Sequence, residues 1–215
     1  MQLTKYSTAD SYIYSHAATT NYGSNNSVLV AFDAAEDQYW NGLFKFDLSQ
    51  VLVDKLLSAK LRLYGTYPDY PYFNDGMNVH RLKRAWTEGG VTYNKYDGVN
   101  DWQTPGGTGA NDYDSFVLGT KQADRNGPDW FEITLNLEKV KEMCGGSPSF
   151  ANNGFLVLWK YIESSGSTFT FDSKEKSGGN KAELLLEIDS DAEDAIAAYY
   201  FDLCNFLFGI SPANL

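Results

Sequence analysis

The side chains that could carry catalysis are few in this chain of 215 residues. His16 and His80 are the only histidines, and no G-x-S-x-G, H-E-x-x-H or glycine-rich phosphate-binding motif occurs. A carboxylate pair for glycoside hydrolysis depends on proximity in space, and the sequence singles out no pair among its 28 acidic residues. We therefore expect a protein that is not an enzyme, with a polysaccharide-degrading enzyme as the less favoured alternative. His80 is interpreted as a packing residue within a strand.

Two long loops combine aromatic with polar side chains, as a sugar-binding surface requires. They span 65–76 and 94–113, and loops of this length in a compact domain are often functional. An exposed ring stacks on the C–H face of a sugar, while carboxylates and amides bind its hydroxyl groups. The alternative is that these rings cover the ends of the fold or pack against a neighbouring subunit. The expected ligand-binding residues are Tyr67, Tyr70, Tyr72, Tyr96 and Trp102.

The net charge of −11 bears on the class of partner. A strongly negative chain repels the phosphate backbone, so we expect no nucleic-acid partner. An acidic polysaccharide would need clustered cations, and two predicted strands carry a set that converges if the strands are neighbours. The alternative is a solvated outer face on which acids balance these cations. The residues concerned are Lys60, Arg62, Arg81, Lys83 and Arg84.

Alternation of apolar and polar residues predicts about ten strands and one short internal helix. The helix spans 137–144 with Asn136 as its N-cap, and an all-β antiparallel sandwich over residues 1–189 accounts for this pattern. The predicted strands are 11–14, 27–32, 39–48, 58–64, 77–83, 91–93, 115–118, 130–135, 155–159, 168–172 and 184–188.

The stretch Thr168–Ile188 organises the predicted sheet. Phe169 and Phe171 alternate with polar residues, the segment 177–180 has turn chemistry, and 184–188 alternates again. We interpret this stretch as a β-hairpin that closes a sheet against strands formed much earlier in the chain.

Residues 190–215 differ in kind from the rest. Ser190 and Glu193 form a capping box, and 192–208 reads as a helix that is apolar nearly all round. Such a helix must be buried on several sides, so we expect it to anchor the sandwich to other protein subunits. The alternative is a helix docked wholly on its own domain. The expected interface residues are Ile196, Tyr199, Tyr200, Leu203, Phe206 and Leu207.

Six stretches, in order, resemble the disaggregatase-related (DNRLRE-type) carbohydrate-binding modules. They cover the chain from Met1 to about Asp189. The stretches are Ala9–Ile13, Asn21–Ser24, Leu43–Ser49, Ala59–Tyr64, Trp86–Glu88 with Val91–Asn94, and Phe171–Glu175.

This resemblance implies a jelly-roll β-sandwich that binds polysaccharide without cleaving it. It also implies that Trp86 is a buried wedge and Glu88 its structural partner. Such modules are normally attached to secreted enzymes or cell-surface proteins, whereas this chain begins with no signal-peptide core and adds the apolar helix. We therefore expect a virion decoration or surface-layer component on an extracellular surface, with no membrane span. A soluble polysaccharide-binding module remains the alternative.

Jelly rolls often hold a structural calcium ion between chain ends and loops, using carboxylate and carbonyl oxygens. Asp10 and Asp172 lie in the first and last of the resembling stretches, so they are the expected calcium ligands. The two cysteines, Cys144 and Cys204, have neither the spacing of a metal site nor that of a disulfide framework, and we expect two thiols.

Overall fold

The computed structural model describes residues 1–67, 76–122, 127–160 and 168–189. In these residues ten strands form one antiparallel sheet and α1 (Leu137–Met143) is the sole α-helix. Two short 3-10 helices, η1 (Ser15–Ala17) and η2 (Val53–Lys55), lie in connections. The strands are β1 (Gln2–Tyr14), β2 (Ser27–Asp33), β3 (Gln38–Phe46), β4 (Leu56–Thr66), β5 (Gly76–Arg81), β6 (Gly119–Gln122), β7 (Asp129–Thr134), β8 (Phe155–Lys160), β9 (Thr168–Asp172) and β10 (Glu183–Ile188).

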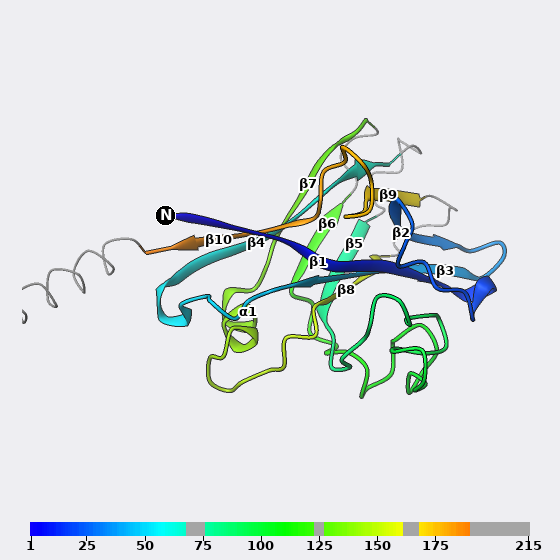
Figure 1. Cartoon of the computed structure of the whole chain (residues 1–215), viewed down its shortest axis with the longest axis horizontal. Coiled ribbons are helices and arrows are strands. Elements are labelled where there is room, and N and C mark those ends of the chain that lie inside the picture. The colour runs from blue at the N-terminus through cyan, green and yellow to red at the C-terminus, as the bar shows by residue number, and fades with distance from the viewer. Residues whose placement is uncertain (68–75, 123–126, 161–167, 190–215) are drawn as a thin grey trace, which may run out of the picture.

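Strand β1 pairs with two strands, β10 and β3, that lie apart in the strand order (Figure 1). Its first residues pair with β10, and from Ser7 onward it pairs with β3, with a register shift between Ser7 and Ala9. The path β1-β10-β4-β9-β2-β3 therefore returns to β1, so the sheet folds over on itself. Strands β8, β5 and β6 continue outward from β3, and β7 pairs with β4. The prediction of an antiparallel β fold of ten strands is confirmed.

The main core lies between the two faces that this closure brings together. It is filled by alternate residues of facing strands, such as Leu61 and Leu63 of β4, Phe44 of β3 and Phe169 and Phe171 of β9, all fully buried. The Phe131 ring of β7 meets both Phe169 and Phe171 edge-on, with centroids 5.6 Å apart. Such aromatic burial is the dominant favourable contribution to folding.

The predicted hairpin over 168–188 is wrong in its pairing. β9 pairs with β2 and with the end of β4, whereas β10 pairs with β1 and with the first half of β4. Strand β4 thus separates the two, because it is long enough to pair with both. The expectation that this stretch closes the sheet against early strands is confirmed by the pairings with β1 and β2.

Other boundaries also differ from the expectation. Residues 91–93 and 115–118 are not strands, β6 lies at 119–122, and β1 begins already at Gln2. The internal helix is confirmed, since the Asn136 side chain accepts a hydrogen bond from Lys139 N at 3.1 Å. The predicted helix 192–208 and its six interface residues lie outside the described residues. No helix among the described residues has the length and apolar character to cross a membrane.

Candidate functional site

The segment from Leu82 to Leu118 folds over the outer face of β3 and β8, opposite the main core, and appears as the green coil in Figure 1. A second, smaller core holds it there: Trp86 and Trp102 of the segment pack with Leu43 of β3 and Leu156 of β8. Trp86 is 2% exposed and donates from Nε1 to Asn153 O at 2.9 Å. The buried wedge expected at Trp86 is therefore confirmed.

A groove of about 670 Å³ opens between this covering segment and the sheet; we call it the aromatic groove. Clefts of this size that are lined mainly by aromatic groups with a few polar groups are the usual form of small-ligand sites. Its lining residues are Phe32, Ala34, Tyr39, Asn41, Tyr93, Thr104, Pro105, Thr108, Leu158 and Trp159.

Tyr39 presents its ring at the groove, with 38% of the residue exposed. Its hydroxyl donates to Asp37 Oδ1 at 3.0 Å, and its ring centroid lies 4.8 Å from that of Phe32. Asn41, two residues along β3 and so on the same face, is buried and donates to Gly106 O at 3.0 Å. Strand alternation thus aligns an exposed ring with a polar side chain that anchors the covering segment.

Trp159 lines the same groove from β8. Its ring packs on Phe169 with centroids 5.5 Å apart, and on Tyr67 at 6.4 Å. The indole Nε1 of Trp159 is a buried donor with no hydrogen-bond partner among the described residues. A buried donor without a partner is costly, and the ring that carries it borders the groove.

A second groove, of about 660 Å³, lies on the other side of Pro105 and has a polar lining that includes Asn21, Thr92, Lys95, Asp101 and Trp102. Several of its polar side chains are already engaged in contacts within the protein. Asn21 Nδ2 donates to Glu88 O and Val91 O, both at 2.7 Å, and Lys95 Nζ lies 2.9 Å from Asp101 Oδ1. This groove offers no exposed ring face among its described residues.

The expected ligand-binding residues are not gathered in one place. Tyr67 is fully buried and stacks near Phe169, so the expectation that its ring is displayed in a loop is wrong. Trp102 is 4% exposed, and its Nε1 donates to Thr92 O at 3.0 Å. It lines the polar groove, but little of its ring is accessible there. Tyr96 is half-buried against Trp102. Tyr70 and Tyr72 lie outside the described residues.

The four aromatic residues of the groove were not predicted from the sequence as site residues. Phe32, Tyr39 and Trp159 fell within predicted strands and Tyr93 within a resembling stretch, so none was singled out. For Tyr39 the available signal was its alternation with Asn41 at the start of a strand. The four residues lie close together because β3 pairs with β2 and β8 and because the covering segment packs on the sheet.

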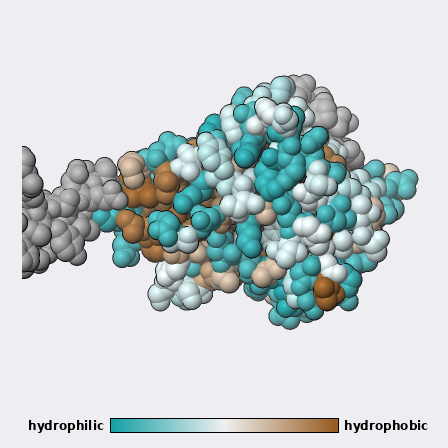
Figure 2. All heavy atoms as spheres, viewed as in Figure 1, coloured by the Kyte–Doolittle hydropathy of each residue, from teal (hydrophilic) through white to brown (hydrophobic). Residues whose placement is uncertain are grey.

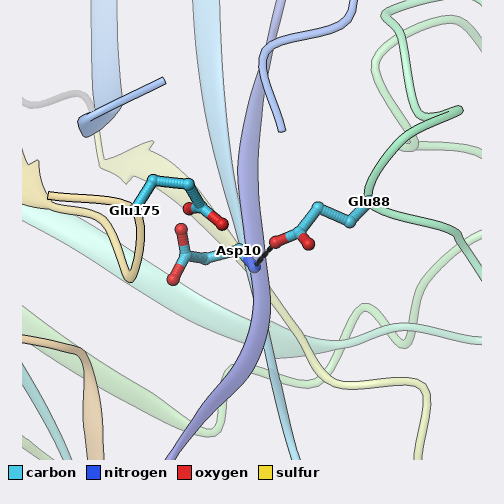
Figure 3. Close-up of side chains that lie close together, drawn as sticks. All are labelled: Asp10, Glu88 and Glu175. Carbon is cyan, nitrogen blue, oxygen red and sulfur yellow. Dashed lines mark hydrogen bonds between the residues drawn. The ribbon is translucent and has the colours of Figure 1, made fainter. Parts of the chain in front are cut away.

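A cluster of three carboxylates joins distant parts of the fold (Figure 3). Asp10 lies on β1, Glu88 on the covering segment and Glu175 after β9, each with one oxygen within 4.8 Å of the others. Glu88 Oε1 accepts from Asp10 N at 2.8 Å, so Glu88 makes a structural contact with β1, and its expected partnership with Trp86 stays a prediction. The Lys174 ammonium contacts Glu175 and lies 3.0 Å from Glu88 Oε2. We call these four residues the acidic clasp.

The acidic clasp contains Asp10, one of the two expected calcium ligands. Asp172 does not join it, because Asp172 pairs with Lys176 at 2.6 Å and accepts from Asn180 N. Burial raises the pKa of Asp10 to about 6, although hydrogen bonds from Lys174 N and Ser7 Oγ oppose that rise. Three carboxylates suit Ca²⁺ by donor chemistry, but the Lys174 ammonium already supplies a positive charge there. A calcium ion would have to displace that ammonium.

The five basic residues do not converge on one sheet face. Lys60 and Arg62 on β4 pair with Glu132, and Arg62 pairs also with Glu183. Arg81 is 3% exposed between Asp114 and Glu142. Lys83 donates to Ala110 O and Arg84 pairs with Asp112. On β4, acids therefore balance the cations, as the alternative interpretation expected. Because Arg81 is buried, the five residues do not form the continuous basic surface that an acidic polysaccharide would need.

Neither histidine ring is hydrogen-bonded to a carboxylate side chain among the described residues, as a catalytic acid–base pair would require. His80 is buried, its Nδ1 lies 3.1 Å from Asp114 O and from Phe116 O, and burial lowers its pKa. It is a packing residue, as predicted. His16 is exposed in η1 beside Ser15. Burial raises the pKa of the Cys144 thiol to about 11, so this thiol is not activated as a nucleophile.

Residues 2–100 match the family model described as carbohydrate-binding module family 96. The match contains five residues of the aromatic groove, from Phe32 to Tyr93, and two members of the acidic clasp. It supports a carbohydrate-binding β-sandwich, and modules of this kind are generally not catalytic. No curated protein matches the chain significantly.

Proposed function

We propose that this chain is a non-catalytic carbohydrate-binding module of the jelly-roll, disaggregatase-related type, and that the aromatic groove holds the glycan. The observation that carries the proposal is the exposed Tyr39 ring in a cleft that also offers Tyr93 and Trp159. Ring faces there suit the C–H face of a pyranose, while Asn41, Thr104 and Thr108 suit its hydroxyl groups. The match of residues 2–100 to a carbohydrate-binding family supports the same function.

Affinity electrophoresis through gels that contain soluble polysaccharides tests this proposal. We expect retardation of the wild-type protein, and about tenfold weaker binding for Tyr39→Ala, the loss that corresponds to ~1.4 kcal/mol of stacking. Tyr6→Ala is the matched control, since Tyr6 is 56% exposed on β1 and does not line the groove. Equal loss in both variants, or no retardation on any polysaccharide, would contradict the proposal. Release of soluble products would favour the enzyme alternative.

The proposal includes attachment of the module to other protein subunits through residues 190–215, on a virion or another extracellular surface. Met1, Leu52 and Leu57 are 59%, 48% and 54% exposed, and we call them the apolar rim. They surround the end of β10: Ile188 N donates to Met1 O at 2.7 Å and Asp189 N to Lys55 O at 2.8 Å. Figure 2 shows hydrophobic residues gathered at this end of the molecule.

Exposed apolar residues beside Asp189, after which the apolar sequence 190–215 begins, support burial of both in an assembly. Light scattering on the full chain, on Leu57→Lys and on a chain that ends at Asp189 tests this part. We expect the full chain to associate, the shortened chain to be a folded monomer and Leu57→Lys to associate less. A monomeric full chain would instead support the soluble polysaccharide-binding module.

A further inference from the structure

The aromatic groove is a neutral surface in a strongly acidic protein. Its ten described lining residues include no aspartate, glutamate, lysine, arginine or histidine, whereas the whole chain has a net charge of −11. Side-chain hydrogen bonds from these lining residues to a ligand would come from amide and hydroxyl groups.

The charge nearest to the rings is negative. Asp37 lies in the turn between β2 and β3 and accepts a hydrogen bond from the Tyr39 hydroxyl at 3.0 Å. Burial raises the pKa of Tyr39 and of Tyr93, and the charge of Asp37 raises both further. The field of this carboxylate therefore reaches two of the ring-bearing residues that border the groove.

Among the described residues, no cation lines the groove to offset that field. Lys95 belongs to the polar groove, where its ammonium lies 2.9 Å from Asp101 Oδ1. Lys160 follows Trp159 in β8 but is not one of the lining residues. On β4 the cations are paired with glutamates. A bound uronate carboxylate would lose hydration and gain no described cation in return.

We infer that the aromatic groove selects neutral saccharides and rejects polymers of uronic acids. This inference rests on the proposed function and names its ligand class. The physical reason is that a carboxylate placed there is desolvated next to the charge of Asp37, and like-charge juxtaposition is strongly unfavourable. The neutral hydroxyl groups of glucose, mannose or xylose units meet no such penalty.

Isothermal titration with oligosaccharides of defined composition tests the selectivity. The probes are neutral oligomers of glucose, mannose and xylose, and acidic oligomers of mannuronate and galacturonate, each at low and at high salt. We expect at least one neutral series to bind about tenfold or more tightly than either acidic series at low salt. The difference should shrink at high salt, because salt screens repulsion between charges near the surface.

Asp37→Asn is the matched variant. The asparagine amide keeps an acceptor for the Tyr39 hydroxyl, and asparagine tolerates the φ of 50° at this position. We expect the ratio of neutral to acidic affinity to fall several-fold in this variant, because the negative charge is removed while an acceptor for the Tyr39 hydroxyl remains. Acidic oligomers that bind wild type as tightly as neutral ones, and lose that binding in Tyr39→Ala, would overturn the selectivity and leave the site intact. Absence of any binding that Tyr39→Ala weakens would overturn the site itself.

Discussion

The Tyr39 hydroxyl donates a hydrogen bond to Asp37 Oδ1 over 3.0 Å, and this contact holds an exposed ring at the aromatic groove. The acceptor comes from a turn in which Asp37 has a φ of 50°, a conformation that aspartate and asparagine adopt more readily than most residues. The turn that joins β2 to β3 therefore does more than connect two strands, because it restricts the orientation of the ring that we assign to glycan stacking.

Tyr39→Phe separates stacking from this tether. The variant keeps a ring of the same shape, but the hydrogen bond to Asp37 is lost, and such a bond contributes about 1 kcal/mol. We expect glycan affinity to fall by about fivefold or less, clearly less than in Tyr39→Ala. Titration calorimetry on the two variants measures the difference. Equal losses would show that the hydroxyl, and not the ring face, makes the contact.

Asp10→Asn tests the cost of the buried charge in the acidic clasp. The rise of the Asp10 pKa from 3.8 to about 6 means that its ionised form destabilises the fold by roughly 3 kcal/mol. The folded chain holds this proton more tightly than the unfolded chain does, so wild-type stability from this group is present below about pH 4 and lost as the pH rises through 6. We expect Asp10→Asn to raise the melting temperature at pH 8 and to change it little near pH 4.

The outcome that contradicts this account is a destabilised Asp10→Asn protein at pH 8. Ser7→Ala is a useful companion, because the Ser7 hydroxyl donates to Asp10 Oδ2 at 3.0 Å and favours the ionised form. Its removal should destabilise wild type most at high pH.

Lys174→Ala tests whether calcium, which the sequence led us to expect at Asp10, can bind in the acidic clasp. Removal of the ammonium leaves Asp10, Glu88 and Glu175 without the positive charge that lies among them. We expect millimolar Ca²⁺ to raise the melting temperature of this variant, and EDTA to reverse the effect, because Ca²⁺ prefers carboxylate oxygens. In wild type the ion competes with Lys174, so the shift should be smaller. A variant that does not respond to Ca²⁺ would refute calcium binding at this position.

Arg81→Met tests how much the buried ion pairs of Arg81 contribute to the stability of the fold. Its guanidinium contacts Asp114, lies 2.6 Å from Glu142 Oε2 and packs 3.8 Å over the Phe150 ring. Arg81→Met leaves Asp114 without this cation and leaves Glu142 paired with Lys139, so we expect a loss of about 3 kcal/mol in the free energy of unfolding. Lys60→Met is the control, since its pair with Glu132 is 40% and 43% exposed and should contribute less than about 1 kcal/mol. Urea denaturation measures both.

Much of the sheet could be predicted because many strands alternate cleanly. In β4 the buried residues Leu61 and Leu63 alternate with the paired cations Lys60 and Arg62, and the period-two pattern shows this directly. Strand β6 was missed because its sequence, GTKQ, contains no apolar residue and its place depends on pairing with β5. The hairpin was wrongly predicted because nothing local to 168–188 shows that β4 lies between its two strands.

The candidate site was less predictable than the sheet. Tyr67 follows β4 in an apparent loop, and its burial depends on contact with Phe169 and Trp159, which lie far along the chain. Asp10 and Asp172 were expected together as calcium ligands, but the carboxylates that lie near Asp10 are those of Glu88 and Glu175, which come from the covering segment and from the loop after β9. Burial of single rings and carboxylates is a tertiary property that local sequence patterns do not encode.

The most direct test of the central claim is a saccharide titration followed through the indole N–H resonances of the tryptophans. Trp159 Nε1 has no hydrogen-bond partner among the described residues, whereas the indoles of Trp86 and Trp102 donate to Asn153 O and Thr92 O. If the aromatic groove holds the glycan, a neutral oligosaccharide that binds will shift the Trp159 indole resonance and leave that of Trp86 unchanged. Saturable binding that leaves the Trp159 resonance in place would contradict the account.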